Sequence, residues 1–275
     1  MIKITGILLI SISIFIIVLF LIFAIIKQNN AKRNRINIAI DDIDYVINNR
    51  KGNTSFSLLK ENNKLKIPKN TKNRFLFISF DNRKDIMYLD KHNDNINEYV
   101  NKYDYEYKFT DTCHHNVYWC KIKLVLEELE TNKYDYVVWL DTDTAIQNMN
   151  IDINDIVNKY DSDILVGNDN HRLQDLINAG VFIIKNSESG KQFLKDCIGN
   201  VRDSCFNKDG SLNGYWAASC YEQGQMNILI KNKYSKNTTV LPTNIIFNYD
   251  KCSNNTFIMH FYRSGKKNMN HCFSN

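Results

Sequence analysis

The sequence has few prolines, no ordered cysteine pattern and no strong net charge. Two of its 275 residues are proline, and 35 basic against 30 acidic residues give a net charge of only +5. This mild balance, with much of the basic excess near the N-terminus, does not favour a nucleic-acid partner. The seven cysteines include no Cys-x-x-Cys pair and no metal-ligand spacing, so no cysteine metal site is expected. An odd number leaves at least one cysteine unpaired within the chain.

The N-terminus carries a long apolar run. Residues Ile4–Ile26 read ITGILLISISIFIIVLFLIFAII and contain no charge. A helix of this length spans about 34 Å, enough for the ~30 Å hydrocarbon layer of a membrane. A cleaved signal peptide is the alternative, but its apolar run is usually only ~7–15 residues and ends at a small-x-small cleavage site. We therefore predict a short tail at residues 1–3 and a single-pass membrane anchor at residues 4–26.

Charge and sequons disagree about which side of the membrane the rest of the chain occupies. Only Lys3 precedes the anchor, whereas several basic residues soon follow it, and the positive-inside rule would place the C-terminal part in the cytosol. Sequons at Asn53, Asn237 and Asn254 favour instead a glycoprotein that faces a lumen. The residues alone leave both orientations open.

Beyond the anchor, the chain divides into a polar stem at residues 27–72 and an alternating region at residues 73–275, without internal repeats. In the alternating region, short apolar runs are separated by amphipathic stretches, which predicts an α/β domain with a largely parallel sheet. The expected strands are residues 74–80, 105–109, 134–140, 163–168, 178–185 and 257–261. The expected helices are residues 85–103, 118–130, 152–160, 187–199 and 221–231.

Two aspartates stand where the run YDYVVWL, at residues 134–140, comes to an end. Asp141 follows the run directly, and Asp143 lies two positions further on. Ligands of open α/β sheets lie beyond the C-terminal ends of the strands, and residues two apart on an extended segment point the same way. Their hard oxygen ligands suit Mg²⁺ or Mn²⁺, which keep positions for water and phosphates. The pair predicts a metal that holds a diphosphate, although a surface turn without a ligand would explain the same residues.

The string LDTDTA also fits a different chemistry, the DxDxT pattern of haloacid-dehalogenase-like phosphatases. There Asp141 would be the phosphorylated nucleophile and Asp143 the general acid. That fold usually opens with this motif, whereas a strand-rich region precedes it here. No later apolar strand ends in the second acidic pair that such an enzyme needs. The phosphatase is therefore the weaker alternative.

Four strings of the alternating region share their order and spacing with a known family. They are YWCKIKLVLEELETNKYDYVVWLDTDTAIQN, NAGVFIIKNSESGKQFLKD, YEQGQMNILI and FIMHFYRSGKK. Over roughly residues 74–266 the chain thereby resembles glycosyltransferase family 34, which includes fungal α-galactosyl- and α-mannosyltransferases and plant xyloglucan xylosyltransferases. The resemblance implies a GT-A fold, a Rossmann-like α/β domain that binds a nucleotide-sugar with Mn²⁺, or Mg²⁺ as the alternative. It also implies a type II membrane protein with its catalytic domain in the lumen of the Golgi or endoplasmic reticulum.

The resemblance further implies three groups of site residues. The expected metal ligands are Asp141, Asp143 and His260. The expected catalytic residues are Lys121, Glu222 and Gln223. The expected contacts with the nucleotide-sugar are Ser79, Asp81, Asn178, Ala179, Gly180 and Lys266.

Each assignment has a plainer explanation in the residues themselves. His260 could be a satisfied histidine at a strand end, and Lys121 one more lysine in a lysine-rich chain. The segment from Asn178 could simply begin a strand. Two positions also depart from the family pattern, because Glu222 replaces the usual Asp and Lys266 lies one residue further from the histidine.

The expected activity is a retaining, hexosyl-type transfer of a hexose or pentose to a glycan acceptor. UDP-galactose, GDP-mannose and UDP-xylose are the donor types that the family uses. No carboxylate stands out as a nucleophile, so the expected mechanism is front-face attack, with the leaving phosphate assisting deprotonation of the acceptor and Gln223 positioning the sugar. A membrane-anchored sugar-binding protein without turnover is a further alternative. The sequence leaves open the donor, the acceptor, the linkage and the formation of homo- or hetero-oligomers.

Overall fold

The computed structural model describes residues 72–169, 177–214, 218–248, 255–262, 265–266 and 269–273. The predicted anchor at residues 4–26 and the predicted stem up to residue 71 lie outside this part of the chain. Among the residues that the structure describes, no helix has both the length and the apolar character needed to cross a membrane.

Six strands form the main sheet, in the order β2-β1-β3-β6-β5-β7. Their bounds are β1 Phe75–Phe80, β2 Glu106–Thr110, β3 Tyr136–Leu140, β5 Ile164–Asn168, β6 Ile177–Lys185 and β7 Thr238–Leu241. All of them run the same way except β6, which is antiparallel to both of its neighbours, β3 and β5. The predicted largely parallel sheet is thus confirmed, with one reversed strand in its interior.

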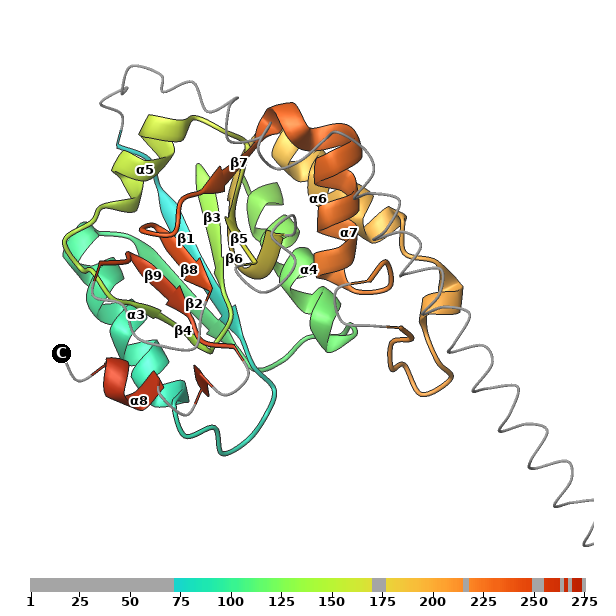
Figure 1. Ribbon diagram of the computed structural model, residues 1–275, viewed down its shortest axis with the longest axis horizontal. Coiled ribbons are helices and arrows are strands. Elements are labelled where there is room, and N and C mark those ends of the chain that lie inside the picture. Colours follow the sequence, from blue (N-terminus) through green and yellow to red (C-terminus); the bar gives the residue numbers. More distant parts are fainter. Residues whose placement is uncertain are drawn as a thin grey trace, which may run out of the picture.

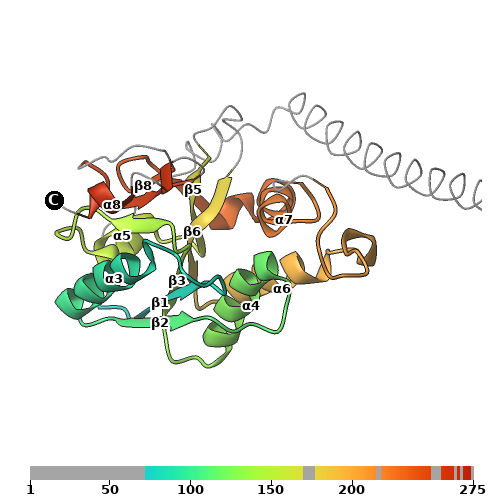
Figure 2. The same cartoon turned by 90° about the horizontal axis from the view of Figure 1, so that it is seen from below.

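Helices bury both faces of this sheet (Figures 1 and 2). In β1, Leu76 and Ile78 point into one hydrophobic core, while Phe75 and Phe77 point into the other, as the two-residue period of a strand requires. The first core is completed by α4 (Val117–Glu130), α6 (Glu188–Gly199) and α7 (Glu222–Leu229), and the second by α3 (Leu89–Tyr103) and α5 (Ile153–Tyr160). Burial on both faces explains why β1 and β3 are apolar runs in the sequence, whereas the edge strand β2, with the sequence EYKFT, is partly exposed.

A second, smaller sheet has the strand order β4-β9-β8. Its strands are β4 (Thr144–Ile146), β9 (Ile258–His260) and β8 (Ile246–Asn248). Only three residues separate the end of β3 from the start of β4, and β9 pairs antiparallel with β4, so that His260 stands opposite Thr144. β8 runs parallel to β9 and places Asn248 opposite His260. This sheet therefore brings residues near the C-terminus to the end of β3.

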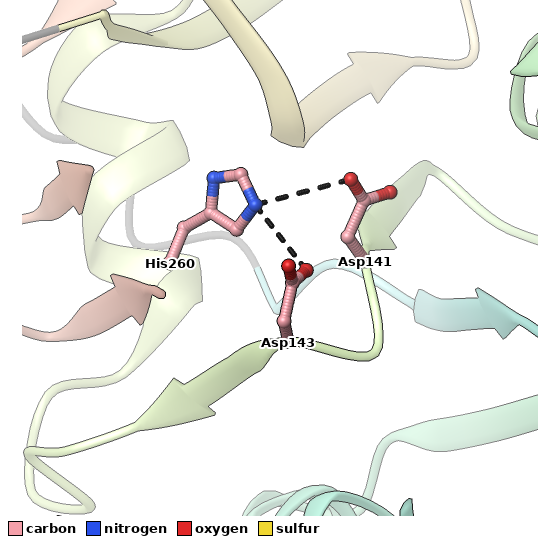
Figure 3. A group of neighbouring side chains, drawn as sticks. All are labelled: Asp141, Asp143 and His260. Atoms are coloured by element: carbon pink, nitrogen blue, oxygen red, sulfur yellow. Dashed lines mark ion pairs between the residues drawn. The ribbon is translucent and has the colours of Figure 1, made fainter. Parts of the chain in front are cut away.

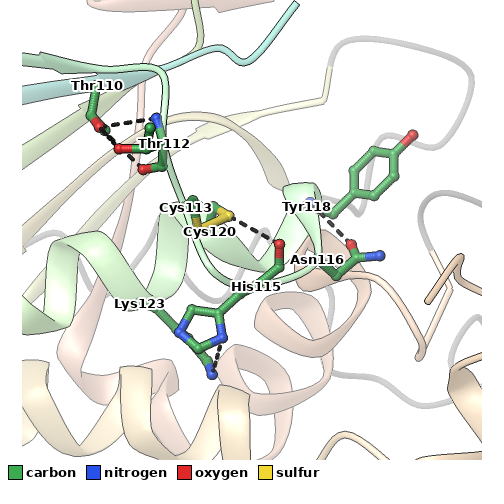
Figure 4. The surroundings of a disulfide bond; sticks show 8 residues. All are labelled: Thr110, Thr112, Cys113, His115, Asn116, Tyr118, Cys120 and Lys123. Atoms are coloured by element: carbon green, nitrogen blue, oxygen red, sulfur yellow. Dashed lines mark hydrogen bonds between the residues drawn. A yellow bond between two sulfur atoms is a disulfide. The ribbon is translucent and has the colours of Figure 1, made fainter.

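The first turns of α4 and α7 are tied together. Asn116 caps α4, its side chain accepting the Tyr118 N–H at 3.1 Å, and the Cys113–Cys120 disulfide joins the preceding loop to the first turn (Figure 4). The indole of Trp119 donates to the Cys220 carbonyl at 3.2 Å, just before α7 begins. A second disulfide links Cys220 to Cys205. These bonds bring the predicted site residues at the starts of both helices to the same place.

The remaining described elements are short. They are η1 (Asp203–Cys205), η2 (Ile230–Tyr234), η3 (Ser235–Asn237) and α8 (Met269–Cys272). Cys272 is also disulfide-bonded, whereas Cys197 is a free, buried thiol.

Candidate active site

The candidate site lies where β3 ends and β6 begins. Because β6 runs against β3, its first residues stand beside the last residues of β3, and the Asp141 N–H donates to the Gly180 carbonyl at 2.8 Å. The Thr144 N–H donates to the Asp141 carbonyl at 3.0 Å, which closes the turn that carries both aspartates. This is the carboxyl edge of the parallel strands, where α/β domains bind their ligands.

Asp141, Asp143 and His260 converge at this edge (Figure 3). His260 Nε2 lies 3.3 Å from Asp143 Oδ1 and 3.9 Å from Asp141 Oδ2. One ligand atom from each residue lies within 4.8 Å of the others, so the three could hold one metal ion. The Phe261 N–H donates to the Asp143 carbonyl at 2.8 Å and so fixes the end of β9 against the aspartates. Two carboxylates and an imidazole are a donor set that fits a divalent ion.

Lys266 contacts the carboxylate oxygen of Asp143 that does not face His260. Its Nζ lies 2.7 Å from Asp143 Oδ2. Burial alone would raise the pKa of Asp143, but His260 and Lys266 together hold it well below its ordinary value. Burial likewise opposes the charge on Lys266, yet the carboxylate of Asp143 raises the pKa of this lysine overall. At neutral pH the site therefore contains an ionised acceptor for a cation and an ammonium group beside it.

Lys121 forms a buried charged cluster with Asp141 and Glu222. Its Nζ lies 2.9 Å from Asp141 Oδ1 and 3.2 Å from Glu222 Oε1. Burial disfavours the ammonium, but the two carboxylates more than offset this and raise the pKa of Lys121. Burial raises the pKa of Glu222, although Lys121 opposes that shift. The lysine thus holds one expected metal ligand, Asp141, and one expected catalytic residue, Glu222, in fixed positions.

Gln223 supports the start of β6. Its Oε1 accepts the Ala179 N–H at 3.1 Å, and the Asn178 side chain accepts the Gly180 N–H at 2.7 Å. Gln223 Nε2 and Glu222 Oε2 are buried without a hydrogen-bond partner. A buried donor and a buried acceptor side by side, both unsatisfied, are suited to the hydroxyl groups of a ligand.

Two cavities adjoin at this site. The first, of about 510 Å³, is lined by two residues of the expected segment at the start of β6, Asn178 and Gly180, and also by Asp169, Glu222, Gln223 and His260. Ala179, the third residue of that segment, is buried and lines neither cavity. The second, of about 380 Å³, extends toward the end of β1, and its lining includes Asp81, Arg83, Trp139, Thr142 and Asp143. Both are lined by Tyr118, Lys121, Asp141 and Lys266. The candidate metal ligands therefore stand at the junction of the two spaces.

Ser79 and Asp81, two of the expected nucleotide-sugar contacts, both belong to the region where β1 ends but differ in their placement. Asp81 lines the second cavity, and it accepts hydrogen bonds from Arg83 at 2.6 Å and from the Thr142 hydroxyl at 2.5 Å. Ser79 is fully buried, contacts His92 Nε2 through its hydroxyl at 2.9 Å, and lines neither cavity. Its position gives no support to the expected contact with the nucleotide.

Among the residues at the site that were not expected from the sequence are Tyr118, Trp139 and Asn248. Tyr118 lines both cavities and packs edge-on against Tyr221, with ring centroids 4.8 Å apart. Tyr118 lies three positions before Lys121 on α4, and residues at this spacing share one face of a helix. The spacing could therefore have identified Tyr118 as a site residue. Trp139 donates from its indole to Asp141 Oδ1 at 2.7 Å, and Asn248 contacts His260. Asn248 belongs to a three-residue strand that leaves no periodic signal in the sequence.

A mixed α/β sheet with an acidic metal-binding group at its carboxyl edge is typical of enzymes that use nucleotide-linked substrates. Residues 70–268 match the sequence profile of a family described as nucleotide-diphospho-sugar transferase, and the chain belongs to this family. No curated protein matches the chain.

Among the solved structures that are similar to this chain, one shows the same fold. A glycosyltransferase involved in the glycosylation of the major capsid of PBCV-1 is similar with a TM-score of 0.54 and 14% identity, covering 72% of this chain and 98% of its own. Apo GlyE, a glycosyltransferase of Streptococcus pneumoniae TIGR4, gives a TM-score of 0.45 and 11% identity over 75% of this chain and 61% of its own. A197 from STIV gives 0.36 and 17% identity over 62% and 82%.

The family match confirms the predicted class, a nucleotide-sugar transferase with a GT-A-like domain. It favours this class over the dehalogenase-like phosphatase that the string LDTDTA also fits. The narrower assignment to glycosyltransferase family 34 stays a prediction, as do the metal's identity and the roles of the individual site residues.

Proposed function

We propose that this chain is a metal-dependent glycosyltransferase that moves a hexose or pentose from a nucleotide-sugar to a glycan acceptor. The observation that carries this proposal is the arrangement of the site, in which the Asp-Asp-His group and Lys266 lie between the two cavities. A nucleotide-sugar has the same order, since its anionic diphosphate lies between the sugar and the nucleoside. Family membership supports the same substrate class.

Asp141, Asp143 and His260 would hold Mn²⁺, with Mg²⁺ as the alternative. Such an ion supplies positive charge to the diphosphate, which becomes more negative as the sugar leaves. Lys266 lies 2.7 Å from Asp143 and offers a second positive group at the same place. The nucleoside would occupy the cavity beside Asp81 and Arg83.

The sugar would occupy the cavity beside Glu222 and Gln223. The unpartnered Gln223 Nε2 can donate to one sugar oxygen and the unpartnered Glu222 Oε2 can accept from a hydroxyl. Gly180 lines the same cavity, and its missing side chain leaves the space in which the His260 ring packs against β6. Lys121 keeps Glu222 in place through the buried ion pair.

We extend the proposal to retention of anomeric configuration by front-face attack. The bond between the anomeric carbon and the phosphate oxygen breaks, and its electron pair stays with that oxygen. The acceptor oxygen bonds to the same carbon on the same face, and its proton passes to the leaving phosphate oxygen. The alternative is a covalent intermediate on Glu222 or Asp169, the carboxylates of the sugar cavity that are not proposed as metal ligands. Mass-spectrometric detection of a glycosyl adduct on either residue would contradict front-face attack.

A donor panel tests the proposed function. The purified full-length chain is given UDP-galactose, GDP-mannose or UDP-xylose, with Mn²⁺ or with EDTA, and release of UDP or GDP is measured. We expect metal-dependent release from one donor, and at least a hundredfold slower release from Asp143→Asn, since removing one group that stabilises transition-state charge typically costs about 10²–10³ in rate. Asp111→Asn, at an exposed aspartate, is the matched control. A folded chain that releases no nucleotide from any donor would favour a binding protein without turnover. Equal release with Mn²⁺ and with EDTA would contradict the proposed metal dependence.

We also propose that residues 4–26 anchor the chain with its transferase domain in the Golgi or endoplasmic reticulum lumen, as in glycosyltransferase family 34. The 23 uncharged residues support the anchor, and the disulfides Cys113–Cys120 and Cys205–Cys220 support an oxidising compartment. In sealed membrane vesicles we expect added protease to spare the transferase domain until detergent is present. Digestion without detergent would place the domain in the cytosol.

A further inference from the structure

His260 is held through the ring nitrogen that faces away from the aspartates. Its Nδ1 lies 2.9 Å from Asn248 Oδ1, while Nε2 faces Asp141 and Asp143. Asn248 and His260 are register partners on the parallel strands β8 and β9. Both side chains are buried, with 0% and 5% of their residue surface exposed.

A second hydrogen bond decides which way the Asn248 amide is oriented. Asn248 Nδ2 lies 2.7 Å from the Asn168 backbone oxygen. A carbonyl oxygen only accepts, so the amide group that faces it must be the NH₂ donor. The amide oxygen of Asn248 then faces His260 and accepts, which requires the hydrogen of the neutral imidazole to be on Nδ1. Nε2 is left with its lone pair directed toward the two aspartates.

Two glycines leave the space that the side chains of His260 and Asn248 occupy. A Cβ on Gly180 would stand 2.5 Å from His260 Nδ1 and 2.6 Å from Nε2. A Cβ on Gly167 would stand 2.9 Å from Asn248 Nδ2 and 2.5 Å from Ile246 Cγ2. β5 and β6 therefore present bare backbone where the histidine and the asparagine pack against them.

We infer that Asn248 is a positioning residue that fixes the tautomer and orientation of His260, so that Nε2 is available as a metal ligand. Hydrogen-bonded partners of this kind typically change metal affinity 10–100-fold when they are lost. The inference rests on the metal site of the proposed function, but it assigns a role to a residue that contacts neither metal nor substrate.

The test measures Mn²⁺ binding to the full-length chain. Binding is detected as the loss of the electron paramagnetic resonance signal of free Mn²⁺, and the Tm of each variant is measured by thermal melting. Asn248→Leu removes the acceptor, and we expect its Kd for Mn²⁺ to rise by about 10–100-fold. Asn248→Asp keeps an acceptor for Nδ1 but loses the donor to Asn168, so we expect a lower Tm with a Kd within about threefold of the parent chain.

Asn95→Leu is the matched control. Asn95 bonds both backbone groups of Ile146, at the end of β4, so its loss should loosen the second sheet without touching His260. If Asn248 only stabilised the fold, the loss of Mn²⁺ affinity in each of the three variants would be in proportion to its loss of Tm. That result would overturn the inference. Unchanged affinity in Asn248→Leu would overturn it as well. A chain that binds Mn²⁺ as expected but releases no nucleotide from any donor would contradict the proposed function and leave this inference standing.

Discussion

At the scale of single residues, the site depends on charges that are buried but paired. Lys121 forms ion pairs with two carboxylates, because Asp141 and Glu222 both lie within 3.2 Å of its Nζ. Only 10% of the lysine side chain is exposed, so water can do little to solvate the charges of this cluster if an ion pair is lost. Removing one partner from such a cluster leaves uncompensated buried charge, which is far costlier than losing an exposed pair.

Lys121→Met should therefore affect both stability and turnover. We expect unfolding free energy to fall by about 3–5 kcal/mol, because two carboxylates lose their cation in a buried place. We also expect the rate of nucleotide release to fall by at least about 10²-fold, because the positions of a metal ligand and a sugar contact are disturbed. Urea denaturation and the donor assay measure the two effects.

Lys108→Met provides the comparison. Lys108 pairs with Glu128 at 2.5 Å, but half of its side chain is exposed, so its loss should cost less than about 1 kcal/mol. Equal stability of the two variants would show that the Lys121 cluster is not what holds this part of the molecule together.

The sequence predicted the residues of the site unevenly. Asp141 and Asp143 could be identified from the residues alone, because an apolar strand ends at them. His260 and Lys266 are distant in sequence and were found only through the resemblance to a family. Ser79 was likewise expected at the nucleotide only through the resemblance, but its side chain points into the core toward His92.

At the scale of elements, long periodic segments could be predicted and short ones could not. The amphipathic helix expected at residues 118–130 is found at Val117–Glu130, and the strand expected at residues 134–140 is found at Tyr136–Leu140. β4 and β8 have three residues each, too few to show a period, and neither was expected. β7, with four residues, was missed for the same reason. β9 also has only three residues, but it lies in the apolar run at residues 257–261 that was expected as a strand.

The reversal of β6 was also beyond the sequence pattern. A buried strand is an apolar run in either direction, so its composition does not reveal which way it runs. The direction matters for the site, because a parallel β6 would have placed Asn178–Gly180 at the opposite edge from Asp141. The pairing of Leu140 with Val181 sets these residues side by side instead.

At the scale of the whole molecule, the site assembles segments from almost the entire transferase domain. The end of β1, the starts of α4, β6 and α7, the turn after β3 and the end of β9 all line the two cavities. Two disulfides and the bond from Trp119 to the Cys220 carbonyl hold the helical side of this assembly. We propose that these segments together hold a nucleoside diphosphate through a metal ion at Asp141, Asp143 and His260.

Calorimetric titration of UDP and GDP into the full-length chain tests that claim most directly. With Mn²⁺ present, we expect one of the two nucleotides to bind, and binding should weaken at least about tenfold in EDTA and in Asp143→Asn, but not in Asp111→Asn. Binding of equal strength with and without metal, or equal strength in Asp143→Asn and the parent chain, would contradict the claim.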